Sequence, residues 1–133
     1  QVLVSGTNDG VPWKIGIRKP DGTADEYIAI LNVTDTCVST SGDYEKYFEV
    51  DGIRYHHILD PRTGFPARGT RSVTVITPDA TLADALSTAL FVMGPAQAIQ
   101  LIDSLQDVDV VIIDESGTMH LSNDIASRIT STP

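Results

Sequence analysis

Cysteine and positive charge are both scarce in this sequence of 133 residues. Cys37 is the only cysteine, so no internal disulfide can form and cysteine usage indicates no redox compartment. Nine Lys and Arg stand against 18 Asp and Glu, and no basic stretch offsets the net charge of -9. This balance argues against a protein that binds nucleic acid or an acidic membrane. A protein this acidic would need to recruit a cation to handle a polyanion such as a nucleotide.

Long hydrophobic runs are also absent. No apolar stretch approaches the roughly 18 residues of a membrane span, and residues 1–6 lack the basic region and apolar core of a signal peptide. Those residues are typical of a strand already under way, so we expect a processed product or an excised domain. The length suits one domain with its own core, and we find no internal repeat, low-complexity segment or linker.

Alternating and β-branched segments predict a chain rich in strands. The expected strands are Val2–Val4, Trp13–Arg18, Tyr27–Val33, Thr36–Thr40, Tyr44–Val50, Ile53–Leu59, Thr70–Thr77, Val108–Ile113 and Thr118–Leu121. The first two are expected to form a hairpin, in which Trp13 packs. Asp51-Gly52 is a strong two-residue signal for another hairpin.

Two helices are predicted after residue 77. Thr77 or Asp79 can cap the first, and Gly94 ends it. Its expected apolar face consists of Leu82, Leu86, Ala89, Leu90 and Met93. Pro95 suits the first turn of a second helix that runs to about Leu105.

The order of these elements predicts the fold class. Many strands precede one helical pair, and residues 123–129 are expected to add a short terminal helix. This order favours an α+β domain over residues 1–133, with a mostly antiparallel sheet and a packed helical pair.

Tyr55–Pro66 carries the richest run of reactive side chains. At a strand end, His56 and His57 point to opposite faces, so only one can join a given site. Asp60-Pro61 opens a turn, and Gly64 accepts a positive φ without strain. The run is either a polar surface turn or a rigid loop that holds a general base beside hydrogen-bond partners for a phosphorylated ligand.

Two further segments are candidates for binding. Thr40–Asp43 can offer hydroxyl and backbone N–H groups to a phosphate or ribose, although Ser-Gly-Asp is also common turn chemistry. Asp84 and Thr88 lie four residues apart on one helix face and are oxygen ligands of the kind that Mg²⁺ accepts. Two such residues are often merely solvated, but here small residues surround them and permit close approach of a ligand. His120 is expected to be structural or exposed.

Three segments, taken together and in order, resemble the ApbE family, the FAD:protein FMN transferases formerly described as thiamine-biosynthesis lipoproteins. They are Ser39–Phe48, His57–Gly64 and Ala83–Ala89. The resemblance runs over nearly the whole chain but matches only the C-terminal half of a family member. It therefore implies a C-terminal fragment that lacks the N-terminal half of the fold, where part of the FAD pocket and one metal ligand are expected.

The resemblance also implies a reaction and its residues. The family is Mg²⁺-dependent and moves FMN from FAD to a Thr or Ser hydroxyl of a target flavoprotein, with release of AMP. His57 would be the base, and Asp84 and Thr88 would be Mg²⁺ ligands. The residues that would form the FAD pocket or support His57 are Ser41, Gly42, Asp43, Tyr44, Asp60, Arg62, Thr63 and Gly64.

Two other functions stay open at this point. Some relatives hydrolyse FAD to FMN and AMP, so a Mg²⁺-dependent FAD pyrophosphatase is one alternative. A non-catalytic flavin-binding or structural domain is the other, because half of the pocket is expected to lie outside this chain. The resemblance implies an extracytoplasmic location, as a periplasmic or cell-envelope lipoprotein. The sequence predicts no nucleic-acid partner.

Overall fold

The computed structural model describes residues 1–131 and shows the predicted α+β architecture. Two helices are present, α1 (Ala80–Met93) and α2 (Pro95–Ile102), and a 3-10 turn, η1, covers Ile125–Ser127. The strands are β1 (Val2–Val4), β2 (Trp13–Arg18), β3 (Tyr27–Val33), β4 (Thr36–Gly42), β5 (Tyr47–Val50), β6 (Ile53–His56), β7 (Thr70–Thr77), β8 (Asp109–Asp114), β9 (Met119–Leu121) and β10 (Ile129–Ser131). No helix in this part of the chain is long and apolar enough to cross a membrane.

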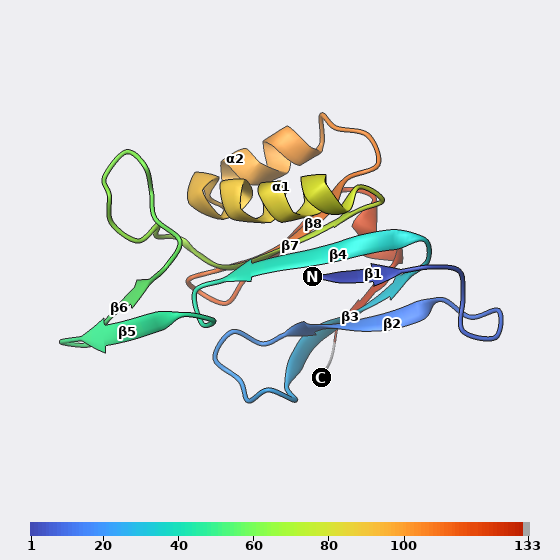
Figure 1. Ribbon diagram of the computed structural model, residues 1–133, viewed down its shortest axis with the longest axis horizontal. Helices are drawn as coiled ribbons and strands as arrows, with labels where there is room; N and C mark the ends of the chain where they lie inside the picture. Colours follow the sequence, from blue (N-terminus) through green and yellow to red (C-terminus); the bar gives the residue numbers. More distant parts are fainter. Residues whose placement is uncertain (132–133) are drawn as a thin grey trace.

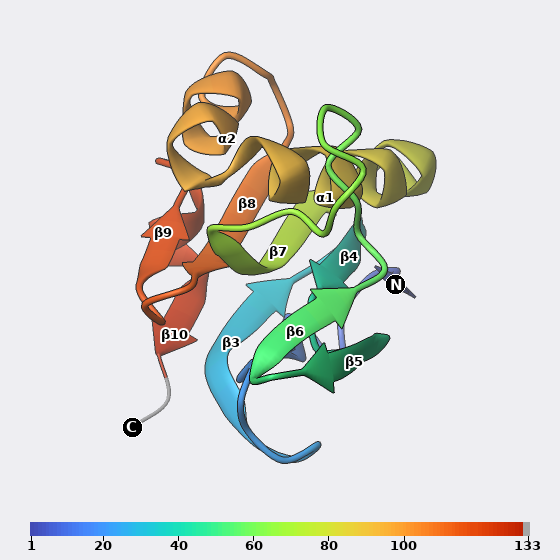
Figure 2. The same ribbon diagram turned by 90° about the vertical axis from the view of Figure 1, so that its left-hand side faces the viewer.

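The elements form three layers around a central antiparallel sheet of strand order β1-β4-β7-β8-β9. Figure 1 shows α1 and α2 over one face of this sheet and the smaller β10-β3-β2 sheet against the other face. The β5–β6 hairpin projects from one end of the layers. The loop that follows β6 rises beside α1 (Figure 2).

The central sheet is buried on both faces, which explains its composition. Val73, Val75 and Val110 face the helices and pack with Leu90 and Phe91, and none of these five side chains is exposed. The opposite face carries Val38, Ile76, Val111 and Ile113, which pack with Leu31 and Ile17 of the small sheet. A strand covered on both sides favours apolar residues on both faces, as the Val and Ile residues of β8 show.

The predicted hairpin of the first two strands is wrong. β1 pairs with β4 in the central sheet, in a register that places Val2 opposite Val38, and β2 pairs with β3 in the small sheet. The segment between them makes its own tight turn, in which Asn8 and Val11 exchange backbone hydrogen bonds. This turn lets the chain leave one sheet and enter the other.

The buried face of α1 also differs from the prediction. Ala83, Ser87, Leu90 and Phe91 are buried, whereas Leu82, Ala89 and Met93 are exposed. Small side chains at 83 and 87 allow the helix to lie close to β4 and β7, so size rather than hydropathy selects the face. Asp79 caps the helix by accepting hydrogen bonds from the backbone N–H groups of residues 81 and 82, and Gly94 ends it.

Three shorter elements have other bounds than predicted. Residues 123–129 do not form a helix but the 3-10 turn η1 and the start of β10, whose pairing with the open edge of β3 satisfies backbone groups there. α2 ends at Ile102 rather than near residue 105. The β5–β6 hairpin is shorter than expected, and the backbone beyond His56 forms the loop described next.

Candidate functional site

His56 and His57 lie at the end of β6 and point in opposite directions, as alternation predicts. His56 is 5% exposed, and its Nε2 lies 2.9 Å from the carbonyl oxygen of Ala67. His57 is exposed, and its Nδ1 lies 3.3 Å from the carbonyl oxygen of Lys46, which also accepts a hydrogen bond from the His57 backbone N–H. A carbonyl only accepts, so this contact places the proton on Nδ1 of a neutral His57 and leaves the Nε2 lone pair for an incoming proton.

The Asp60–Pro66 loop is held rigidly by its own hydrogen bonds. The Asp60 carbonyl accepts from the backbone N–H groups of Thr63 and Gly64, and the Asp60 N–H donates to the carbonyl of Phe65. Gly64 has a φ of 74°, a conformation that favours glycine. The Asp60 carboxylate accepts from the backbone and guanidinium of Arg62, which holds the pKa of that carboxyl below its usual range. The loop therefore carries Arg62 at the surface, paired with Asp60.

A hollow of about 600 Å³ lies between this loop, β6 and α1. Its walls combine apolar and aromatic side chains with two arginines. The lining residues include Ile53, Tyr55, Phe65, Val92, Thr63, Asp60, Arg62 and Arg68. Apolar walls with a few polar groups at the rim are typical of small-molecule sites. Aromatic rings and guanidinium groups suit a ligand that carries both a ring system and phosphate.

Three hydroxyl groups meet where β4 crosses α1. The Ser41 Oγ lies 2.9 Å from the Ser87 Oγ and 3.1 Å from the Thr88 Oγ1. Ser87 is buried and also donates to the carbonyl of Asp84, one turn earlier on the helix. The side chains of Asp84 and Thr88 are exposed. The structure thus brings Thr88, one of the two predicted metal ligands, to the predicted Ser41, and it adds Ser87, which the sequence offered only as one of several small residues.

The donor set at this point fits a hard cation such as Mg²⁺. The donors on offer are oxygen atoms, namely the hydroxyls of Ser41 and Thr88, which are in contact, and the Asp84 carboxylate one helical turn before Thr88. Residues 1–131 contain no group of three or more His, Cys, Asp or Glu side chains that could hold a metal alone. Mg²⁺ commonly takes only one or two carboxylates from the protein and completes its shell with phosphate oxygens and water.

Asp43 faces inward rather than toward the hollow. Its carboxylate, 6% exposed as a residue, lies 2.6 Å from Nε of Arg71 and 3.4 Å from Nη1 of Arg54. Arg71 also donates to Asp21, 2.9 Å away, and lowers the pKa of that carboxyl. We name Asp21, Asp43, Arg54 and Arg71 the ion network. It joins β4, β6 and β7 to the β2–β3 turn, so the Asp43 side chain is engaged within the protein.

Gly42 and Tyr44 form a second packed pair in the same segment. A Cβ on Gly42 would lie 2.7 Å from the Tyr44 ring, so only glycine fits beneath that ring. The guanidinium of Arg18 lies over the Tyr44 ring, 5.2 Å from its centroid. Burial raises the pKa of the Tyr44 phenol. Tyr44 is therefore held by its close packing with Gly42 and by the charge of Arg18.

Comparison with known proteins identifies the family of this chain. The ApbE family model matches residues 1–112. The chain belongs to the ApbE family. It is 43% identical over 118 residues to the FAD:protein FMN transferase of Treponema pallidum and 40% identical over 115 residues to that of Vibrio cholerae. These matches cover 88% and 85% of this chain, but 33% and 34% of the relatives.

Solved ApbE structures share the fold. The crystal structure of the ApbE protein of Thermotoga maritima matches with a TM-score of 0.83 and 46% identity, over 92% of this chain and 40% of that one. The flavin transferase ApbE of Vibrio cholerae matches with a TM-score of 0.74 and 34% identity, over 93% of this chain and 40% of that one. The chain thus spans about a third of the length of the curated relatives it matches.

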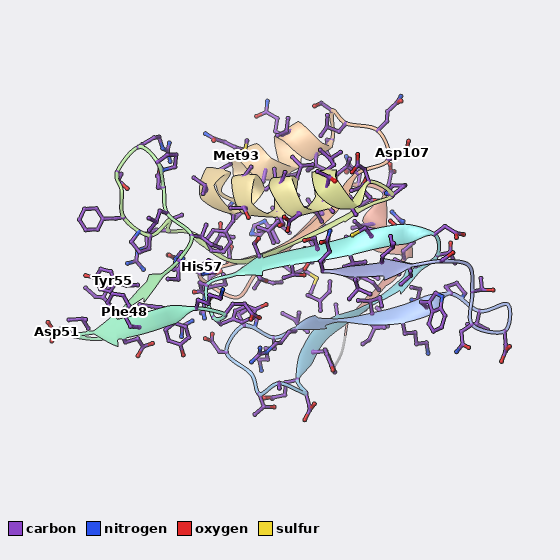
Figure 3. The ribbon with its side chains drawn as sticks, in the orientation of Figure 1. Phe48, Asp51, Tyr55, His57, Met93 and Asp107 are labelled. Carbon is purple, nitrogen blue, oxygen red and sulfur yellow. The ribbon has the colours of Figure 1, made fainter. Side chains whose placement is uncertain are left out.

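Within this ApbE chain, the predicted site residues lie in three places. Asp60, Arg62 and Thr63 line the first hollow, Gly64 belongs to the same loop, and His57 follows the lining residue Tyr55 by two positions. Ser41 meets Thr88 of α1, one turn after Asp84. The Gly42–Tyr44 segment packs within the protein. Figure 3 shows His57 where the β5–β6 hairpin joins the body of the molecule. A second hollow, of about 560 Å³, lies beside Asp35, Asp107 and Asp109 and contains none of the predicted site residues.

Proposed function

We propose that this chain belongs to an FAD:protein FMN transferase, which moves FMN from FAD to a Thr or Ser hydroxyl of an acceptor flavoprotein and releases AMP. One observation carries the proposal. In a chain 43% identical to such a transferase, His57 is exposed with Nδ1 engaged by the Lys46 carbonyl, and its Nε2 is left as the basic atom. An imidazole with this arrangement is suited to accept the proton of a hydroxyl group near neutral pH.

The reaction balances with His57 as the base. The hydroxyl oxygen of the acceptor attacks the phosphorus on the FMN side of the FAD pyrophosphate. The bond from that phosphorus to the bridging oxygen breaks, and AMP leaves with that oxygen. The hydroxyl proton passes to Nε2 of His57. Such a transfer depends on positioning and on neutralisation of the phosphate charge more than on covalent chemistry.

The protein's share of the metal site is also part of the proposal. Asp84 and Thr88 would hold Mg²⁺, and Ser41 would orient the Thr88 hydroxyl through their 3.1 Å contact. Bound Mg²⁺ would neutralise charge on the pyrophosphate. Such help is needed because the chain carries a net charge of -9.

The hollow between the Asp60–Pro66 loop, β6 and α1 would receive part of FAD. Thr63 lines it, Asp60 binds the guanidinium of Arg62, Phe65 supplies an aromatic wall, and Gly64 would shape the loop itself. The Ser41–Tyr44 segment would act through its hydroxyl and backbone, since the Asp43 carboxylate is engaged by Arg54 and Arg71. The location outside the cytoplasm that the resemblance implies belongs to the same proposal, and cell fractionation tests it.

A single assay tests the function. The protein as its gene encodes it is incubated with FAD, Mg²⁺ and a candidate acceptor flavoprotein, and AMP is followed by chromatography and acceptor mass by mass spectrometry. We expect AMP and a flavin-modified acceptor in equal amounts, and loss of both in His57→Ala and Asp84→Ala. The matched controls are His120→Ala and Asp25→Asn, at exposed or half-exposed positions outside the site. Full transfer by His57→Ala would refute the proposal.

The same assay separates the alternatives. Nε2 of an exposed His57 can take a proton from water as well as from a hydroxyl group, so hydrolysis of FAD is the second candidate. It yields AMP and free FMN with an unmodified acceptor. A non-catalytic domain yields no AMP, even with Mg²⁺ and the complete protein.

A further inference from the structure

His56 is the buried neighbour of the candidate base and has no part in the proposed reaction. Its Nε2 lies 2.9 Å from the carbonyl oxygen of Ala67, which can only accept, so Nε2 carries the proton. Its Nδ1 is buried and has no hydrogen-bond partner within residues 1–131. Burial lowers the pKa of His56. A second proton would place an unpaired charge in the interior, so the imidazole stays neutral and acts as a donor through Nε2 only.

The bond from His56 closes the loop that carries the proposed site. The loop leaves β6 at His57 and returns at Ala67, whose own N–H donates to the carbonyl of Ile58. Leu59 and Pro66 form a bridge just beyond. His56 thus adds a side-chain link to the neck of the loop, on the side opposite to His57.

His56 also joins this loop to the helix with the proposed metal ligands. Its ring meets Phe91 of α1 edge-to-face, with centroids 5.5 Å apart and planes at 72°. Phe91 is fully buried and fixed in the core, two turns after Asp84 on the same helix. One imidazole therefore contacts the loop through a hydrogen bond and the helix through a ring contact.

We propose that His56 is a positioning residue, which fixes His57 and the Asp60–Gly64 loop relative to Asp84 and Thr88 by bonding Ala67 and packing on Phe91. The inference rests on the proposed function. It predicts that removal of the donor loosens the loop and lowers turnover although His57 is intact. A shift of about 1 Å in a reacting group can cost on the order of 100-fold in rate.

Two variants separate the effect of the His56 hydrogen bond to Ala67 from the effect of its ring contact with Phe91. His56→Phe keeps a ring against Phe91 and removes the donor, whereas His56→Gln loses the ring and can place an amide donor near Ala67. We expect kcat to fall on the order of 10- to 100-fold in His56→Phe, with KM for FAD changed much less, and to recover largely in His56→Gln. His120→Gln is the control and retains the wild-type kcat.

The pH profile distinguishes a positioning role of His56 from a role as the base. The acid limb of kcat should persist in both His56 variants, because both retain His57, the proposed base. The charged or titratable groups near His56 are Asp43, Arg68 and His57, and both variants retain all three. If the acid limb disappears with His56 while His57→Ala keeps it, His56 is itself the base and the inference is overturned.

Hydrogen exchange tests the clamp, meaning the link that His56 makes between Ala67 and Phe91, and it needs no enzymatic activity. The amides of Asp60 and Ala67 donate across the loop and its neck, so they should exchange faster in His56→Phe and near the wild-type rate in His56→Gln. Unchanged exchange in His56→Phe, or unchanged kcat despite faster exchange, would overturn the inference. A kcat loss that only follows the fraction of unfolded protein would do so too. If wild-type protein releases no AMP, the proposed function fails, and the exchange rates still decide whether the clamp exists.

Discussion

The ion network gives the sharpest stability prediction, with Asp43→Asn as the perturbation. The side chains of Asp43 and Arg71 are 9% and 16% exposed, and their closest atoms lie 2.6 Å apart. Loss of one partner from a buried ion pair costs about 3–5 kcal/mol, because the other charge stays buried without its counter-ion. In Asp43→Asn, Arg71 keeps its ion pair with Asp21, so we expect a loss in the free energy of unfolding at the lower end of this range, about 3 kcal/mol. For a chain of this length, that loss lowers the melting temperature by about 10 °C.

Urea denaturation followed by circular dichroism measures this cost. Asp25→Asn removes an exposed carboxylate from the neighbouring β2–β3 turn and serves as the matched control, with a change within about 0.5 kcal/mol. Double-mutant cycles with Arg71→Met and Arg54→Met should give a larger coupling energy for Arg71, because its contact with Asp43 is 2.6 Å against 3.4 Å for Arg54. Equal midpoints for Asp43→Asn and Asp25→Asn would refute this reasoning.

Three further predictions concern packing and pH. Gly42→Ala should cost about 1–3 kcal/mol in urea denaturation, since the new Cβ would lie 2.7 Å from the Tyr44 ring, and a Tyr44→Ala background should remove that cost. On α1, Ala83→Leu should destabilise by about 1–3 kcal/mol and Leu82→Ser by clearly less, and the reverse order would restore the face predicted from the sequence. The His120 and Ser116 hydrogen bonds lower the pKa of Asp114, so its stabilisation is present above the unfolded value of 3.8 and is lost as pH falls below it. Asp114→Asn should therefore flatten the drop in stability between pH 5 and pH 2, and an unchanged drop would contradict this assignment.

The local rules predicted strands well and their partners poorly. Alternation located β2, β3 and β7, and the almost uninterrupted Val and Ile run located β8. The pairing of β1 with β4 depends on residues more than 30 positions away, and nothing in the Gly6–Val11 turn reveals that the chain changes sheets there. The prediction for the short edge strand β10 was wrong for a related reason, because its conformation depends on pairing with the open edge of β3.

The helix face shows a different limit. Hydropathy favours Leu82 and Met93, yet the structure buries Ala83 and Ser87. Close packing against a sheet rewards small side chains, and a pattern that ranks residues by hydrophobicity gives small residues little weight. The close approach of α1 to β4 also brings Ser41 into contact with Ser87 and Thr88. The face that hydropathy did not predict therefore lies beside the proposed metal site.

The roles of the reactive groups in the proposed site stay predictions from the sequence, and the residues that support those groups were not predicted. Motif order singled out His57, Asp84 and Thr88, and strand alternation placed the two histidines on opposite faces. The contacts that hold these groups join residues far apart in sequence, such as Ser41 with Ser87 and Asp43 with Arg71. Polar contacts of this kind leave no periodic signal in a single sequence.

The ion network and the candidate base are connected through the β5–β6 hairpin. A two-stranded hairpin alone is marginal in water, and this one exposes Phe48, which stacks on Tyr55 with ring centroids 5.3 Å apart (Figure 3). Its link to the body runs through Arg54, which reaches Asp43 and lies over the Tyr47 ring. The hairpin leads directly into His57, so the contacts that attach the hairpin to the rest of the fold also set the position of His57. Asp43→Asn should accordingly speed amide exchange in β5 and β6 more than in β7 and β8, and a uniform increase would mean that the network stabilises the whole fold and not the hairpin in particular.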